Sequence, residues 1–99
     1  MKIFITGSSG FIGFHLSKKL LDKGHTVHGF DSMNNYYDVR LKKRRYQILK
    51  KYKKFLFTKG KLENRKILSK AILKSKPKII IHLAAQAGVR YSIENLEST

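Results

Sequence analysis

The 99-residue sequence contains no cysteine, no tryptophan and a single proline, Pro77. Without cysteine, the chain has neither disulfides nor thiolate metal ligands. No apolar run approaches the roughly 20 residues that span a membrane, and the three apolar residues before Thr6 are too few for a signal peptide. We therefore expect a reducing, cytoplasmic setting and no membrane partner. The four histidines follow no metal-ligand spacing, so we expect no metal site.

Acidic residues are also scarce, because six Asp and Glu oppose 22 Lys and Arg, giving a net charge of +16. Such an excess attracts polyanions, so nucleic acid or a phosphorylated ligand has to be considered. Lysine, however, predominates over arginine, which is the residue favoured for bidentate phosphate and base contacts. We interpret most of the charge as solvated surface. A nucleic-acid-binding module in residues 41–54 is kept as an alternative.

Strand-like and helix-like segments alternate along the chain. Short apolar strands are expected at residues 2–6, 26–30, 55–59 and 78–83. Apolar residues at helical spacing follow the first strand up to Gly24. They occur again in a basic segment from about residue 38 to 54, and once more before Pro77. Such alternation predicts an α/β fold built on a parallel sheet, because right-handed crossovers return the chain to the same edge.

Three glycines lie between the first strand and the first helix, in T-G-S-S-G-F-I-G. Gly7 allows a tight turn, Gly10 lets a pyrophosphate approach the main chain at the helix N-terminus, and Gly13 lets the helix pack closely on the sheet. The second strand is followed by Asp31, 18 residues after Gly13. A carboxylate at this spacing is typical of an acceptor for a ribose hydroxyl and disfavours a 2′-phosphate, which predicts NAD rather than NADP.

Two further stretches, NNYYDVRLKKRR after Asp31 and HLAAQAGVRYS after the fourth strand, complete a resemblance to the extended short-chain dehydrogenase/reductase family. Within that family of NAD-dependent epimerases and dehydratases, they look most like UDP-glucuronate 4-epimerases. The resemblance implies a Rossmann-like three-layer fold with four parallel strands in the order 3-2-1-4, truncated before the fifth strand. Residues 1–99 would then be the N-terminal part of an NAD-binding domain, and the substrate domain would be absent.

The resemblance also implies which residues bind NAD. The adenosine ribose is expected at Asp31 and Asn35, and the phosphates at the main-chain N–H groups of Phe11 and Ile12. The complete predicted set is Gly7, Gly10, Phe11, Ile12, Gly13, Asp31, Asn35, Lys61, Leu62, Leu83, Ala84 and Ala85.

Lys61 departs from the family, which typically has aspartate at this position to accept from the adenine amino group. Lysine has donors only, so adenine recognition is expected to be weaker here.

The family's reaction removes a hydride from C4 of the sugar with NAD and returns it to the opposite face, with a tyrosine and a lysine four residues later as the catalytic pair. The chain contains one such pair, Tyr46 and Lys50, in the basic segment on the adenosine side of the fold. We interpret it as coincidental, so no catalytic residue is assigned and the chain alone is expected to lack turnover. Arg90 is a candidate for binding the UDP-sugar substrate, with a surface ion pair as the alternative.

The fourth strand would be an uncovered sheet edge in a chain truncated there, so we expect self-association through it. The favoured function is the NAD-binding portion of a UDP-sugar epimerase. A nucleotide-sugar dehydratase or reductase of the same family is the second hypothesis, and the nucleic-acid-binding module is the third.

Overall fold

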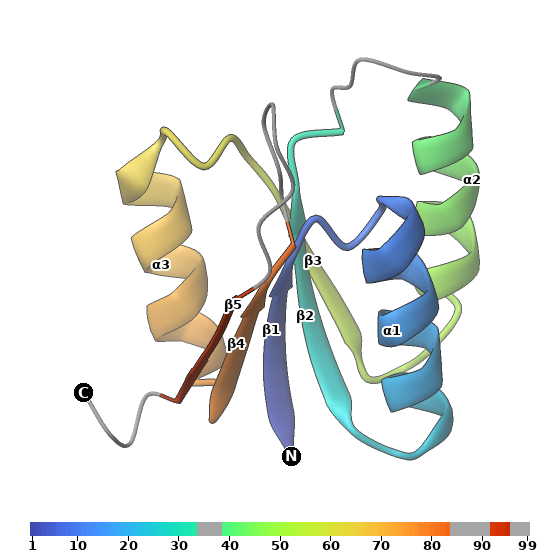
Figure 1. The fold of residues 1–99 in the computed structure, drawn as a ribbon, viewed down its shortest axis with the longest axis horizontal. Coiled ribbons are helices and arrows are strands. Elements are labelled where there is room, and N and C mark those ends of the chain that lie inside the picture. The colour runs from blue at the N-terminus through green and yellow to red at the C-terminus, as the bar shows by residue number, and fades with distance from the viewer. Residues whose placement is uncertain (34–38, 84–91, 96–99) are drawn as a thin grey trace.

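The computed structural model describes residues 1–33, 39–83 and 92–95, which form a sheet with helices on both faces (Figure 1). The strands are β1 (Lys2–Thr6), β2 (Thr26–Asp31), β3 (Phe55–Lys59), β4 (Ile79–His82) and β5 (Ser92–Asn95), and the helices are α1 (Phe11–Asp22), α2 (Val39–Leu49) and α3 (Arg65–Ser75). The strand order is β3-β2-β1-β4-β5. Within the described ranges, no helix is long and apolar enough to cross a membrane.

The first four strands are parallel, as their alternation with helices predicted. β1 lies between β2 and β4, and β2 pairs with β3 on its other side. This confirms the α/β Rossmann-like arrangement and the order 3-2-1-4. Because all four strands point the same way, their carboxyl ends meet at one edge of the sheet. The register places Thr6 opposite both Phe30 and His82, so the residues that follow these three positions are neighbours at that edge.

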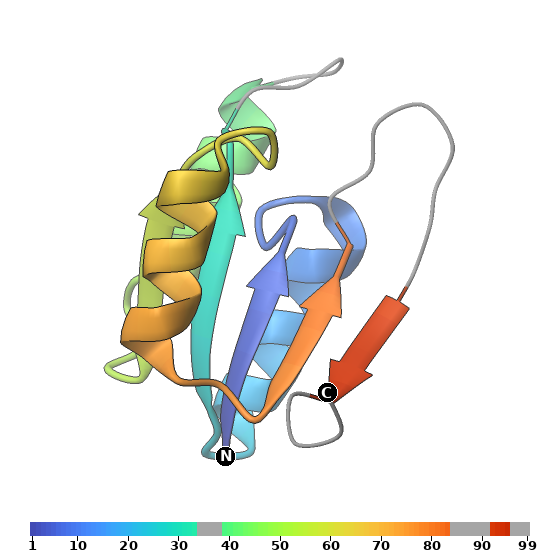
Figure 2. The same cartoon turned by 90° about the vertical axis from the view of Figure 1, so that its left-hand side faces the viewer.

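The expectation of a bare edge at β4 is wrong. β5 pairs with β4 in the antiparallel direction, with Ile79 opposite Asn95 and His82 opposite Ser92 (Figure 2). The backbone N–H and C=O groups of β4 that face away from β1 therefore pair with β5, which disfavours self-association through β4. The sequence SIEN is too short and too polar to have predicted a strand.

Two separate apolar cores hold the layers together because successive strand residues face opposite sides. Helices α1 and α2 cover one face and α3 covers the other (Figure 1). Ile3 and Ile5 of β1 face the first core, together with buried Phe14 of α1 and Leu49 of α2. Phe4, between the two isoleucines, faces α3. The second core comprises Phe4, Phe30, Ala71 and Ile80.

The helix ends match their sequence signals. Gly24 follows α1 with φ of 91°, a left-handed conformation that glycine adopts without cost. Asn64 caps α3 by accepting a hydrogen bond from the Ile67 amide, and α3 ends at Ser75, with Lys76 as its C-cap just before Pro77. Helix α2 is shorter than the basic segment that predicted it, since the chain turns at residues 50–54 before entering β3.

His28 is a buried histidine on the α3 side of β2. Its Nε2 lies 2.7 Å from Thr58 Oγ1, its ring stacks on Phe4, and its Nδ1 has no partner among the described residues. Burial, reinforced by the positive charge of Lys74, lowers the pKa of His28. The folded protein therefore holds this imidazole neutral.

We predict that this buried imidazole makes folding sensitive to mild acid. Below about pH 6.5 the unfolded chain binds a proton at this position that the folded chain binds only at lower pH, so stability falls as the pH decreases from there. Urea midpoints at pH 7.5 and 5.5 measure the loss, and His28→Gln should reduce it. His15→Gln on the exposed side of α1 is the control and should retain it. An equal loss in all three proteins would contradict the prediction.

Candidate functional site

The glycine loop, residues 7–10, turns the chain from β1 into α1 at the carboxyl edge of the sheet. Gly7 has φ of 77°, and its amide donates to the Phe30 carbonyl of β2 at 2.7 Å. The Gly10 amide donates back to the Gly7 carbonyl at 3.1 Å, which closes the turn. A Cβ on Gly13 would lie 1.9 Å from the Gly7 carbonyl oxygen. Helix α1 therefore packs against its own entry loop at a distance that only glycine permits.

Helix α1 begins without a side-chain cap. Gly10, the N-cap residue, has no side chain that could cap the helix, and the first turn contains no acidic residue. The first bond of the helix runs from the Phe14 amide to the Gly10 carbonyl at 2.8 Å. The amides of Phe11, Ile12 and Gly13 precede that bond and form the positive end of the helix dipole. The loop thus presents several N–H donors to an anion, and Gly10 has no side chain to obstruct it.

The two serines of the glycine loop are turned inward. Ser8 and Ser9 are fully buried, and among the described residues neither hydroxyl has a hydrogen-bond partner. Room for Ser8 comes from β2, because a Cβ on Gly29 would lie 2.5 Å from Ser8 Oγ. Gly29, inside β2, therefore makes space for the loop.

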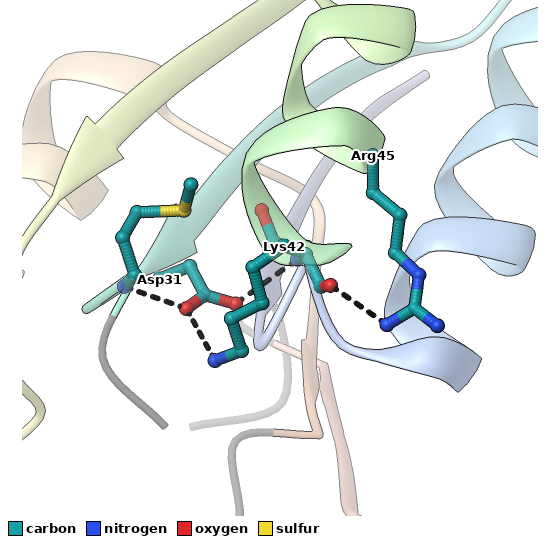
Figure 3. Close-up of polar contacts among 5 residues, drawn as sticks. Asp31, Lys42 and Arg45 are labelled. Carbon is teal, nitrogen blue, oxygen red and sulfur yellow. Dashed lines mark hydrogen bonds and ion pairs between the residues drawn. The ribbon is translucent and has the colours of Figure 1, made fainter. Parts of the chain in front are cut away.

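Asp31 is joined directly to the glycine loop. Its Oδ2 accepts from the Ser9 amide at 3.0 Å, although the two residues are 22 positions apart. Its Oδ1 accepts from the Met33 amide at 2.9 Å and from Lys42 Nζ at 2.8 Å (Figure 3). Met33 has a left-handed φ of 59°, and its N–H bonds to the carboxylate two residues before it, as in an Asx turn. The acid that ends β2 and the three-glycine turn therefore lie together at the carboxyl edge of the sheet, as their spacing predicted.

Helix α2 contributes two cations that the sequence did not single out. Lys42 forms the ion pair with Asp31, and Arg45 donates from Nη1 to the Ser9 carbonyl at 3.2 Å (Figure 3). The Arg45 guanidinium also lies 5.8 Å from the centre of the exposed Phe11 ring. The peptide groups of Ser9 are thus held on both sides, the N–H by Asp31 and the carbonyl by Arg45. The usable signal was the spacing of three between residues 42 and 45, which places both on one helix face.

The carboxyl end of β4 is tied to that of β1. The Leu83 amide donates to Thr6 Oγ1 at 3.0 Å, and this hydroxyl lies 2.6 Å from His82 Nδ1. The link fixes Thr6 immediately before the turn at Gly7.

The end of β3 completes the described part of the site. The Gly60 amide donates to the Asp31 carbonyl at 3.1 Å, so residue 61 follows a point fixed beside β2. Lys61 is exposed, and Leu62 packs on the α3-side core. The predicted residues Asn35, Ala84, Ala85 and Arg90 lie outside the described residues.

Tyr46 and Lys50 show the contacts of a packing pair. The Tyr46 ring lies 4.7 Å from the Phe57 ring of β3, and Lys50 Nζ lies 5.8 Å from the centre of the Tyr46 ring. Among the residues that the structure describes, no group of three or more His, Asp and Glu side chains is placed to hold a metal ion.

Comparison with known proteins identifies the arrangement. The family model described as GDP-mannose 4,6 dehydratase matches residues 4–99. Among curated relatives, the "Probable UDP-glucuronate 4-epimerase" of Rhizobium meliloti (strain 1021) is 55% identical over 95 residues, and "Protein CapI" of Staphylococcus aureus is 56% identical over 95 residues. Both alignments cover 96% of this chain and 28% of the relative, so the chain spans less than a third of their length.

Solved structures give the same picture. The UDP-glucuronic acid 4-epimerase of Bacillus cereus, in complex with UDP-glucuronic acid and NAD, superposes with a TM-score of 0.78 at 36% identity, over 91% of this chain and 28% of that one. A dTDP-glucose 4,6-dehydratase of Bacillus anthracis, in complex with NAD, superposes with a TM-score of 0.75 at 22% identity, which shows a shared fold.

We predict that Arg45 restrains the glycine loop. Arg45→Met removes the bond to the Ser9 carbonyl, so the loop amides should exchange with solvent about tenfold faster, the loss expected for one charge-assisted hydrogen bond. Hydrogen exchange followed by NMR measures this, with the β1 amides reporting global stability. Arg44→Met removes the same charge from an exposed neighbour and should leave the loop unchanged. Equal effects of the two variants would refute the restraint.

Proposed function

Because the chain belongs to the NAD-dependent epimerase/dehydratase family, we propose that it binds NAD as the N-terminal portion of a nucleotide-sugar epimerase of the UDP-glucuronate 4-epimerase type. The observation that carries the proposal is the bond between the Asp31 carboxylate and the Ser9 amide. It brings the acceptor proposed for a ribose and the amides proposed for phosphates into a single site. The identity to two curated relatives above 50%, one of them named as a probable UDP-glucuronate 4-epimerase, supports the epimerase type.

The residues present fit a dinucleotide. The uncapped N-terminus of α1 offers amides to the pyrophosphate, and Gly10 leaves room for its approach. Two buried serine hydroxyls of the loop have no hydrogen-bond partner among the described residues. When bound, NAD supplies the oxidant that accepts and returns a hydride. In this proposal, the chain's own residues bind and orient the adenosine and pyrophosphate half.

UDP-glucuronate is the proposed substrate by likeness to the relatives, and Arg90 is the proposed contact to its diphosphate or carboxylate. No catalytic tyrosine is assigned, because the contacts of Tyr46 are those of a packed side chain. We accordingly expect binding without turnover by residues 1–99.

A dehydratase of the same family is the second candidate. The family model that matches residues 4–99 carries the description GDP-mannose 4,6 dehydratase, and that observation favours it. The proposed cofactor half is common to both candidates. Their distinction depends on the substrate chemistry and not on the glycine loop.

The test of cofactor binding is Gly10→Val. A Cβ at Gly10 meets the Gly7 carbonyl oxygen at 3.3 Å, a tight contact that a small local shift relieves, whereas the valine methyl groups would occupy the phosphate approach. We expect saturable NAD binding by the unaltered chain in calorimetric titration and a loss of at least about tenfold in the variant, since the amide contacts to a charged phosphate are lost. Circular dichroism and thermal melting check that the variant is folded.

Leu73→Val alters an exposed residue of α3 and should bind NAD like the unaltered chain. A chain that fails to bind NAD, or that binds random DNA with strong salt dependence equally well before and after Gly10→Val, would overturn the proposal in favour of the nucleic-acid alternative.

Adenine recognition provides a further prediction. Lys61→Asp supplies the acceptor that lysine lacks, so NAD should bind about tenfold more tightly, as one hydrogen bond to a charged group allows. Titration calorimetry measures the change. Lys66→Asp makes the same change of charge at an exposed position on α3 and should have a smaller effect. Unchanged affinity in Lys61→Asp would reject the adenine contact.

A further inference from the structure

The acid that should select NAD is covered by a lysine. The Asp31 side chain is only 2% exposed and the Lys42 side chain 12% exposed, with Nζ and Oδ1 2.8 Å apart. Asp31 disfavours a 2′-phosphate only in so far as its negative charge is unbalanced. In this chain, an ammonium group balances it at hydrogen-bond distance, in a place where water provides little screening.

The surroundings add further positive charge. Arg45 lies on the same face of α2 and bonds to the Ser9 carbonyl, next to the amide that Asp31 accepts. Lys61 follows the point where Gly60 bonds to the Asp31 main chain. Helix α2 has no acidic residue in its first turn, and the N-termini of α1 and α2 lie toward the same edge of the sheet (Figure 1). Cations near a helix N-terminus are unfavourable for the helix but favourable for a bound anion.

Within the described ranges, three donors bond to the Asp31 carboxylate, and of these only Lys42 is charged. The amides of Ser9 and Met33 are fixed by the main chain. A lysine ammonium on a flexible four-carbon stem can turn from the carboxylate to a phosphate a few ångströms away and keep an anionic partner throughout. A ribose bearing only hydroxyls offers Lys42 no such replacement.

We propose that Lys42 makes this site accept the 2′-phosphorylated dinucleotide, NADP, in addition to NAD. The inference rests on the proposed function, because it takes Asp31 to be the ribose acceptor. In this view, Asp31 accepts from the ribose hydroxyls of NAD, and Lys42 turns to the 2′-phosphate when NADP is bound. The expectation from the sequence alone, that the acid favours NAD, is thereby reduced to a weak preference.

Titration calorimetry of the 99-residue chain with NAD and with NADP, in 150 mM NaCl, tests the proposal. We expect the two dissociation constants to lie within about tenfold of each other, the equivalent of one charge-assisted hydrogen bond. Lys42→Met should raise the ratio of the NADP constant to the NAD constant by at least about tenfold, through weaker NADP binding. Lys43→Met, which removes the same charge from an exposed neighbour, is the matched control and should leave the ratio unchanged.

Lys42→Met leaves Asp31 without its cation, so its folding is checked by circular dichroism. If the methionine variant does not fold, Lys42→Gln replaces it, because glutamine keeps a donor for the carboxylate but removes the charge. The same rise in the ratio of the NADP constant to the NAD constant is expected. NADP binding more than about tenfold weaker than NAD in the unaltered chain, or equal shifts in the Lys42 and Lys43 variants, would overturn the inference and leave NAD binding intact. Binding of neither dinucleotide would instead overturn the proposed function.

Discussion

The rest of the site depends on one hydrogen bond, which the Ser9 amide donates to the Asp31 carboxylate. It joins the turn after β1 to the end of β2, two places that the parallel register brings to the same edge but does not itself connect. Once that bond is made, the Ser9 peptide has a fixed orientation, and Arg45 fixes its other side. The N-terminus of α1 and the Asp31 carboxylate are then held in one fixed relation.

The order of strands and the place of the site could be predicted from sequence because each depends on local or covalent geometry. Gly7 and Gly13 are required by a left-handed turn and a 1.9 Å approach, which other residues do not tolerate, so their spacing carries information. Asp31 follows a strand of known direction. It therefore had to lie at the carboxyl edge of the sheet, which could be identified without coordinates.

The roles of Lys42 and Arg45 could not be predicted in the same way. Residues 42–45 are all basic, so the sequence does not show which of them face inward. Packing decides this, because Leu49 and Tyr46 turn toward the core of α1 and β3 and thereby orient the helix. β5 was missed for a related reason, since a four-residue segment acquires strand structure only through its partner, β4. The high positive charge had suggested a nucleic-acid surface, yet one of these cations bonds to Asp31 and another to the glycine loop.

Gly29 has a consequence for protein engineering. Ser8 occupies the space that a side chain at this position would fill, so the glycine-loop sequence and the second strand are matched in volume across a distance of 21 positions. A graft that carries T-G-S-S-G-F-I-G alone into another α/β scaffold would bring the turn but not the space that Gly29 leaves for Ser8. The transferable unit is therefore the loop together with the glycine beneath it and the acid two residues beyond.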